Sequence, residues 1–309
     1  MPPMAATLPE VRLSPQGRRA LRWVAILAAV VGVLLGIETL VLHLTTDPLI
    51  DIRRYYEAGA RLNAGQPLYG QTSADTTATY LYPPLLAIVF RPLALLPFPI
   101  AAGIWEAVIV AAFALTLRRI GIRPRVLLVL GLLALPTAWA LTIGQAQVLV
   151  TLLLALGAPW SVALAGQLKV VPVLAALYWV GRGDRRALAQ FVAWSVGLVA
   201  LQVVLAPKAS LDFLGTLGPG QIGHVNNFSP WVLSPFLWAI LFVVGMVITV
   251  ALARTHWGWA AAVALSTLAP PRLLTYMLSS LLAVCRRPDG AEERQSARVR
   301  APDAPRARV

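Results

Sequence analysis

A polar segment from Thr45 to Tyr80 lies between two long apolar stretches and concentrates acids and tyrosines. Its carboxylates, Asp47, Asp51 and Asp75, can accept protons, and its tyrosine hydroxyls can bond to sugars or anchor the chain at a membrane interface. In a chain this apolar, we expect any chemistry to be done here. On spacing alone, however, Asp51 is better explained as a helix-start residue that stabilises backbone N–H groups.

The elements that hold this segment are predicted to be membrane-spanning helices. Hydrophobic residues make up 58% of the chain and charged residues 13%, and the mean hydropathy is +0.73. These values are typical of a multi-span membrane protein and exclude an ordinary soluble domain. We expect an all-α polytopic protein with about eight spans, at residues 23–44, 99–117, 126–142, 146–180, 187–206, 231–253, 257–269 and 272–285.

Two segments depart from simple spans. Residues 81–98 contain four prolines and Arg91, so a re-entrant or broken element covered by protein is expected there. Residues 146–180 are too long for one helix and are interrupted by glycine, proline and Lys169. They are predicted to form two half-helices that dip to the middle of the membrane.

The basic residues indicate how the chain is oriented. Of the 26 lysines and arginines, 19 fall on one side of the predicted membrane, and this asymmetry puts both termini in the cytoplasm. The domains expected are a cytoplasmic arm (1–22), a transmembrane domain (23–285) with extracytoplasmic loops at 45–80 and 207–230, and a disordered basic tail (286–309). The net charge of +13 therefore reports topology in a cell membrane, with contact to membrane lipids, and not nucleic-acid binding.

Within the first loop, one apolar stripe recurs at helical spacing. Its members are Ile52, Tyr55, Tyr56, Gly59 and Leu62. The Asp47-Pro48 pair is the expected start of this amphipathic helix and Gly65 its expected stop. Such a helix is predicted to lie along the membrane surface, with Asp51 near the mouth of any cavity between the spans.

Metal chemistry is not indicated by the sequence. The single Cys285 excludes an intramolecular disulfide and a CxxC site, and the three widely spaced histidines form no metal motif. Acids without a neighbouring carboxylate argue against a Mg²⁺ or Mn²⁺ cage. We therefore expect no metal and no cofactor.

Two cations in or near apolar segments are candidates for binding an anion. Lys169 is costly to bury and is thus a functional candidate, although it can also snorkel from a helix end to an interface. Arg272 opens the last predicted span beside two prolines, where it can also be an interfacial anchor. In the second outer loop, His224 and Asn227 can bond to acceptor hydroxyls or form a turn.

Several blocks of sequence follow one another in a distinctive order. The most specific block runs from Asp51 through the Tyr-Tyr-x-Ala-Gly stretch to Pro67-Leu68-Tyr69 and on to Tyr80-Leu-Tyr-Pro-Pro. Shorter blocks follow in order: Pro92–Pro97, Trp105, Gly144-Gln145, Leu168-Lys169 with Pro172, Asn227–Trp231, and Pro271–Tyr276. Together these blocks resemble glycosyltransferase family 87, the polyprenol-phosphate-mannose-dependent mannosyltransferases of the GT-C superfamily, and the resemblance covers roughly residues 20–285.

The resemblance implies an inverting membrane glycosyltransferase. In such an enzyme a polyprenyl-phosphate donor gives its sugar, mannose in the family, to an extracytoplasmic lipid or glycan acceptor. Asp51 falls where the family has its first-loop aspartate, which assigns it as general base, because a sugar hydroxyl is a weak nucleophile. Lys169 and Arg272 would then bind the donor phosphate and replace a metal. Substrate-binding candidates are Tyr55, Tyr82, Gln145, His224 and Asn227.

Two other functions fit the same residues. Family members are usually longer, so a shortened, non-catalytic GT-C-like membrane protein is one alternative. A transporter is the other, since broken helices are typical of transporters, but no inverted repeat is visible and the acids lie outside the predicted spans. A panel of polyprenyl-phosphate sugars offered to the purified protein would separate these possibilities.

Overall fold

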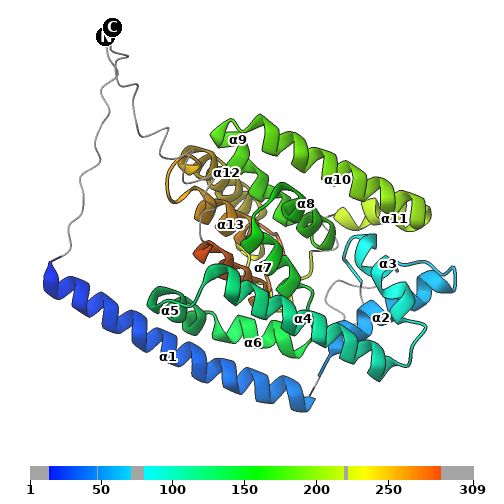
Figure 1. The fold of residues 1–309 in the computed structure, drawn as a ribbon, viewed down its shortest axis with the longest axis horizontal. Coiled ribbons are helices and arrows are strands. Elements are labelled where there is room, and N and C mark those ends of the chain that lie inside the picture. Colours follow the sequence, from blue (N-terminus) through cyan, green and yellow to red (C-terminus); the bar gives the residue numbers. More distant parts are fainter. Residues whose placement is uncertain (1–13, 47, 71–79, 219–221, 287–309) are drawn as a thin grey trace, which may run out of the picture.

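The computed structural model describes residues 14–46, 48–70, 80–218 and 222–286 and shows a bundle of helices (Figure 1). Four helices are long: α1 (Pro15–Thr46), α4 (Phe98–Ile120), α10 (Arg185–Leu205) and α12 (Pro235–Leu252). The shorter α-helices are α2 (Ile50–Asn63), α3 (Pro84–Leu93), α5 (Pro124–Leu132), α6 (Ala134–Thr142), α7 (Gln147–Leu156), α8 (Pro159–Leu168), α9 (Leu177–Arg182), α11 (Pro207–Leu214) and α13 (Gly258–Leu268). Tight 3₁₀ turns form η1 (Val171–Ala176), η2 (Gly215–Leu217), η4 (Pro230–Val232) and η5 (Thr275–Cys285). The described residues contain no strand, which confirms the all-α prediction.

The long helices are those expected in a membrane. All four are apolar enough to cross one, and α5 and α6, bent by 65° relative to each other, can form a fifth span. α1, α10 and α12 expose nearly all of their apolar side chains, as helices in contact with lipid do. The chain is therefore a multi-pass membrane protein.

By length and composition, the described residues hold four helices, or five spans with the bent α5–α6 pair, that could each cross a membrane, beside shorter apolar helices, where about eight spans were predicted. Within the described residues, α13 and η5 have only 11 residues each, too few to cross a bilayer separately. Residues 146–180 form four short elements, α7, α8, η1 and α9, and not two half-helices. The broken element expected at 81–98 is confirmed, because α3 ends at Leu93 and α4 begins only at Phe98.

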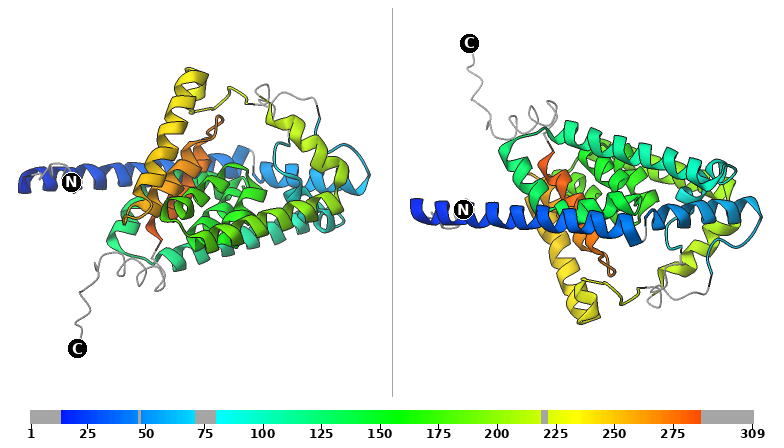
Figure 2. Two further views of the ribbon diagram at one scale, coloured as in Figure 1. Left: turned by 90° about the horizontal axis from the view of Figure 1, so that it is seen from above. Right: turned by 90° about the horizontal axis from the view of Figure 1, so that it is seen from below.

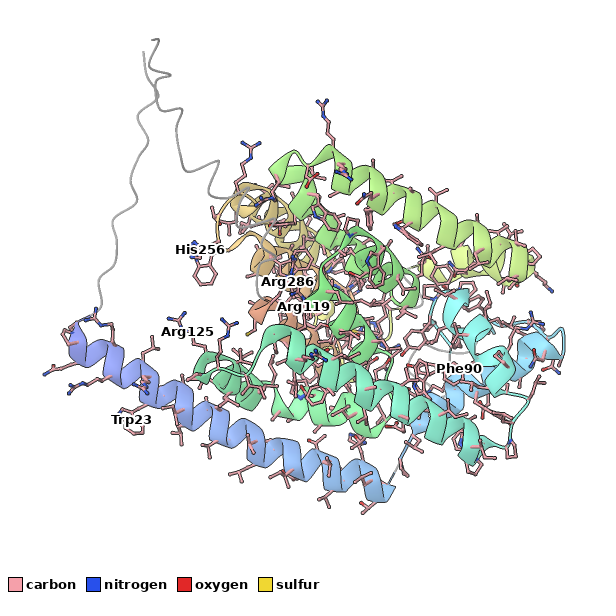
Figure 3. All side chains as sticks on the ribbon, in the orientation of Figure 1. Trp23, Phe90, Arg119, Arg125, His256 and Arg286 are labelled. Atoms are coloured by element: carbon pink, nitrogen blue, oxygen red, sulfur yellow. The ribbon has the colours of Figure 1, made fainter. Side chains whose placement is uncertain are left out.

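Three arginines lie away from the α2–α3 end of the bundle. Figure 3 shows Arg119, Arg125 and Arg286 together, far from Phe90, which lies in α3 beside α2. This grouping agrees with the charge asymmetry of the sequence, while the side of the membrane on which these residues lie stays a prediction. Of the predicted basic arm and tail, residues 1–13 and 287–309 lie outside the described residues.

Helix α1 lies along one edge of the bundle (Figure 2) and contacts α5 and α6 through small residues. Ala29 contacts Gly131, and Gly36 contacts Ala134. A Cβ atom at Gly32 would collide with the backbone carbonyl of Gly131. Small residues at a membrane helix interface allow close backbone approach, which is what attaches α1 here.

We expect Gly32→Leu to loosen α1, because the added side chain has no room beside Gly131. Overpacking of this kind should destabilise the protein by about 1–3 kcal/mol, measured as thermal unfolding in lipid nanodiscs. Gly103→Leu in α4 is the matched control, since a Cβ there meets no atom within 4 Å. Equal stability of the two variants would contradict the close contact between α1 and α5.

Candidate functional site

Asp51 lies in the first turn of α2, where that helix meets the end of α6. The backbone N–H groups of Leu49 and Asp51 donate to the carbonyls of Thr142 and Ile143, at 3.2 and 3.1 Å. Leu49 adopts a left-handed conformation, with φ of 61°, immediately before the helix. A non-glycine residue in this region costs energy and persists only where surrounding contacts enforce it. The turn before α2 is therefore fixed by the two hydrogen bonds that Leu49 and Asp51 make to the end of α6.

The helix itself partly agrees with the prediction. It begins at Ile50, later than the expected Asp47-Pro48 start, and Asp47 lies outside the described residues. It ends at Asn63, followed by Gly65 with φ of 66°, which confirms the predicted stop. Its apolar stripe is covered by protein, chiefly α3 and α4, and not by membrane alone.

The Asp51 carboxylate is buried, with 2% of the residue exposed, and side chains engage both of its oxygens. Arg54 Nη1 lies 2.8 Å from Oδ1, and Gln145 Nε2 donates a short hydrogen bond to Oδ2. A buried carboxylate is stable only when it is paired and hydrogen-bonded. An ionised carboxylate has about four lone-pair sites on its two oxygens, so it can accept bonds beyond those from Arg54 and Gln145.

Gln145 links this carboxylate to two tyrosines. Tyr55 OH donates to Gln145 Oε1 at 2.6 Å and accepts from the Ala146 N–H at 3.3 Å. Tyr82 OH lies 3.2 Å from the same Oε1 and 3.0 Å from Nε2. Burial raises the pKa of Tyr55 well above its usual value, which keeps the phenol protonated and able to donate.

Gln145 and Tyr55 therefore lie behind Asp51. Both are fully buried, and neither lines the cavity described next. The sequence predicted that both residues bind substrate, and that role stays a prediction; in the structure Gln145 donates to the Asp51 carboxylate and Tyr55 donates to Gln145. Their geometry suits a positioning role, because they fix which face of Asp51 is presented.

In front of Asp51 is a cavity of about 500 Å³. Asp51, Tyr82, Lys169 and Arg272 all line it, so four residues predicted from distant parts of the sequence meet here. Lys169 Nζ lies 5.4 Å from the ring centroid of Tyr82 and 4.6 Å from that of Tyr276. This nitrogen is buried and has no hydrogen-bond partner among the described residues. A buried amine without a partner is costly unless something in the cavity bonds to it.

His224 and Asn227 do not line the cavity. His224 is exposed in the loop that precedes η4. Asn227 donates to the Pro271 carbonyl at 2.9 Å and accepts from the Leu273 N–H at 2.9 Å, which ties this loop to the segment that carries Arg272. The alternative of a turn role thus describes Asn227 better than contact with an acceptor.

Sequence reasoning missed several residues of this site. Arg54 had a signal, since it is three residues from Asp51 on the same helix. Trp139 and Gln147 also line the cavity, with Ile143 between them at a spacing of four. Tyr276 and His43 line the cavity as well. The described residues contain no group of three or more His, Cys, Asp or Glu side chains that could hold a metal ion.

Comparison with known proteins gives one family. Residues 80–286 match the profile of glycosyltransferase family 87. The polyprenol-phosphate-mannose-dependent alpha-(1-2)-phosphatidylinositol pentamannoside mannosyltransferase of Mycolicibacterium smegmatis is 28% identical over 250 residues, which cover 67% of this chain and 58% of that protein. The protein of the same name from Mycobacterium tuberculosis is 39% identical over 67 residues, 20% of this chain and 16% of that protein. No solved structure matches the chain.

The matches cover only part of this chain and part of the relatives. The chain spans less than two thirds of the length of the curated relatives it matches. The family match begins at Tyr80, so Asp51 and α2 precede it. The role of Asp51 therefore depends on the geometry of the cavity.

Tyr55→Phe tests the hydrogen-bonded support of Asp51. The change leaves the Ala146 N–H and one lone pair of Gln145 Oε1 unbonded in a buried site, which should destabilise the protein by about 1–3 kcal/mol. Tyr56→Phe is the matched control, because the Tyr56 hydroxyl bonds only the Leu96 carbonyl near the surface. Thermal unfolding of both variants in nanodiscs measures the difference, and equal losses would show that the buried network adds no stability.

Proposed function

The chain belongs to glycosyltransferase family 87, and on that premise we propose that it moves a sugar from a polyprenyl-phosphate donor to a lipid or glycan acceptor. The observation that carries the proposal is a buried carboxylate and a buried ammonium group lining one cavity. Mannose is the proposed sugar, because the relatives named above depend on polyprenol-phosphate mannose.

In the proposed reaction, Asp51 acts as general base. An acceptor hydroxyl attacks the anomeric carbon from the face opposite the phosphate, and its proton passes to the Asp51 carboxylate. The new bond joins the acceptor oxygen to the anomeric carbon. The bond from that carbon to the phosphate oxygen breaks, and its electron pair leaves with the polyprenyl phosphate. The configuration at the anomeric carbon is inverted.

Lys169 and Arg272 are proposed to bind the donor phosphate. A leaving phosphate needs stabilisation of its negative charge but no proton, and two cations beside an apolar wall can supply it. The proposed reaction accordingly uses no metal ion and no cofactor. Tyr82 and Tyr276, whose rings flank Lys169 Nζ, keep the ammonium group fixed.

The site is proposed to open to the extracytoplasmic side of the cell membrane. This assignment is supported by the arginine asymmetry of the sequence, which puts residues 45–80 opposite both termini. A donor with a polyprenyl tail would reach the cavity from the membrane, and the released lipid phosphate would return to it.

We predict that Asp51→Asn lowers sugar transfer by about 10²–10⁴-fold, because an amide cannot take the proton of the acceptor hydroxyl. Transfer is measured with a panel of radiolabelled polyprenyl-phosphate sugars and purified protein in nanodiscs. Asp212→Asn, in α11 and outside the cavity, is the control and should keep wild-type activity. Full activity of Asp51→Asn would show that Asp51 is not the general base.

Lys169→Met should raise the KM for the donor, because the phosphate loses a charged hydrogen bond in an apolar setting. A rise of roughly ten- to hundredfold is expected. Lys208→Met provides an unusually close control, since Lys208 is the only other lysine in the chain and is exposed in α11. A donor KM that is unchanged in Lys169→Met would assign the phosphate site elsewhere.

A further inference from the structure

One wall of the cavity, formed by His43, Trp139 and Gln147, carries aromatic and amide groups. Lys169 follows the end of α8, whereas Trp139 lies in α6 and His43 in α1. The N–H of Asp51 bonds the carbonyl of Ile143, one helical turn beyond Trp139. Asp51 therefore lies next to the wall formed by His43, Trp139 and Gln147, in a cavity that Lys169 and Arg272 also line.

Trp139 presents a partly exposed ring to the cavity. The ring stacks against His43, with centroids 5.0 Å apart and planes tilted by 31°. Its Nε1–H has no hydrogen-bond partner among the described residues, unlike that of Trp105, which donates to the Gly144 carbonyl at 2.9 Å. A flat apolar face with a free donor at its edge suits a ligand that is apolar on one face and hydroxylated at its rim.

Gln147 is a second observation that points to a ligand. Its residue is 5% exposed, it lines the cavity, and its Nε2 donates to Ser280 Oγ at 2.6 Å. Its Oε1 is buried and has no hydrogen-bond partner among the described residues. A buried acceptor of this kind is costly unless something in the cavity donates to it. Gln145, by contrast, is satisfied at both ends of its amide by protein.

We propose that His43, Trp139 and Gln147 form the binding site for the terminal sugar of the acceptor, a neutral hexopyranose. The C–H face of the ring would lie against Trp139, and one sugar hydroxyl would donate to Gln147 Oε1. A neutral ring is specified because these three residues carry no arginine or lysine among them, whereas the phosphate has cations elsewhere in the same cavity. The proposal rests on the proposed function, since it assigns the second substrate of that reaction.

The position of this wall fits inversion. Attack must come from the face of the donor sugar opposite its phosphate, and the phosphate is assigned to Lys169 and Arg272. The acceptor must also reach Asp51 to give up its proton. The wall next to Ile143 is adjacent to Asp51 and carries neither of the two cations. It therefore offers the acceptor a place beside Asp51.

Binding of sugar can be tested without turnover. Saturation-transfer NMR is recorded for methyl α-mannopyranoside and methyl α-glucopyranoside with wild-type protein in nanodiscs. The expected result is a signal that falls at least severalfold in Trp139→Leu and in Gln147→Leu. Trp160→Leu, at an exposed tryptophan outside the cavity, should keep the wild-type signal.

Gln147→Leu also separates binding from folding. The change removes an unbonded buried oxygen together with the hydrogen bond from Nε2 to Ser280, whose hydroxyl keeps Thr151 as a partner at 3.0 Å, so thermal stability should change by no more than about 1 kcal/mol. Loss of the sugar signal at unchanged stability therefore supports the proposal. Equal signals in wild type, Trp139→Leu and Gln147→Leu, or no signal in the wild type at tens of millimolar sugar, would overturn it.

A kinetic arm distinguishes this proposal from the proposed function. In Trp139→Leu the acceptor KM should rise roughly tenfold while the donor KM and the slow hydrolysis of donor by water stay unchanged. Transfer by the wild type with no change of acceptor KM in this variant would contradict the acceptor site alone. Absence of transfer by the wild type, with sugar binding that depends on Trp139, would contradict the proposed reaction alone.

Discussion

The site depends on keeping one carboxylate charged where little water reaches it. Asp51 is buried, and burying a lone carboxylate costs far more than any single contact returns. Arg54 supplies the opposite charge and Gln145 a hydrogen bond, one to each oxygen. Gln145 is then fixed by Tyr55 and by Tyr82. The requirement to pair one charge thus determines much of the chemistry around it.

The backbone around the carboxylate follows from the same requirement. Gln145 reaches Asp51 because the chain turns sharply after α6, at Gly144 with φ of 69°. A side chain at Gly144 would collide with Ile52, so this turn needs glycine both for its conformation and for its close contact with α2. Asp51 N–H bonds the carbonyl just before that glycine. The α2 start and the α6–α7 turn therefore support each other.

Much of the fold could be predicted from the sequence, because long apolar runs and prolines act locally. The positions of α1, α4, α10 and α12 agree closely with the predicted spans. The predictions were less accurate where only the length of an apolar run could distinguish a membrane span from a shorter helix, as in α13 and η5. At the site, a buried cation such as Lys169 was visible as an anomaly. The partnership of Gln145 with Asp51 was not, since it joins side chains 94 residues apart. Nothing in the neighbouring sequence indicated that Trp139 lines the cavity or that Gln147 Oε1 has no hydrogen-bond partner among the described residues.

The central claim is that one cavity holds the donor between a cationic wall and the Asp51 carboxylate. A cryo-EM map of the protein in nanodiscs with a non-hydrolysable polyprenyl-phosphonate sugar tests it most directly. The account predicts the phosphonate within hydrogen-bond distance of Lys169 Nζ, and the anomeric carbon of the sugar facing Asp51. Density for the phosphonate away from Lys169 and Arg272, or a sugar shielded from Asp51, would contradict it.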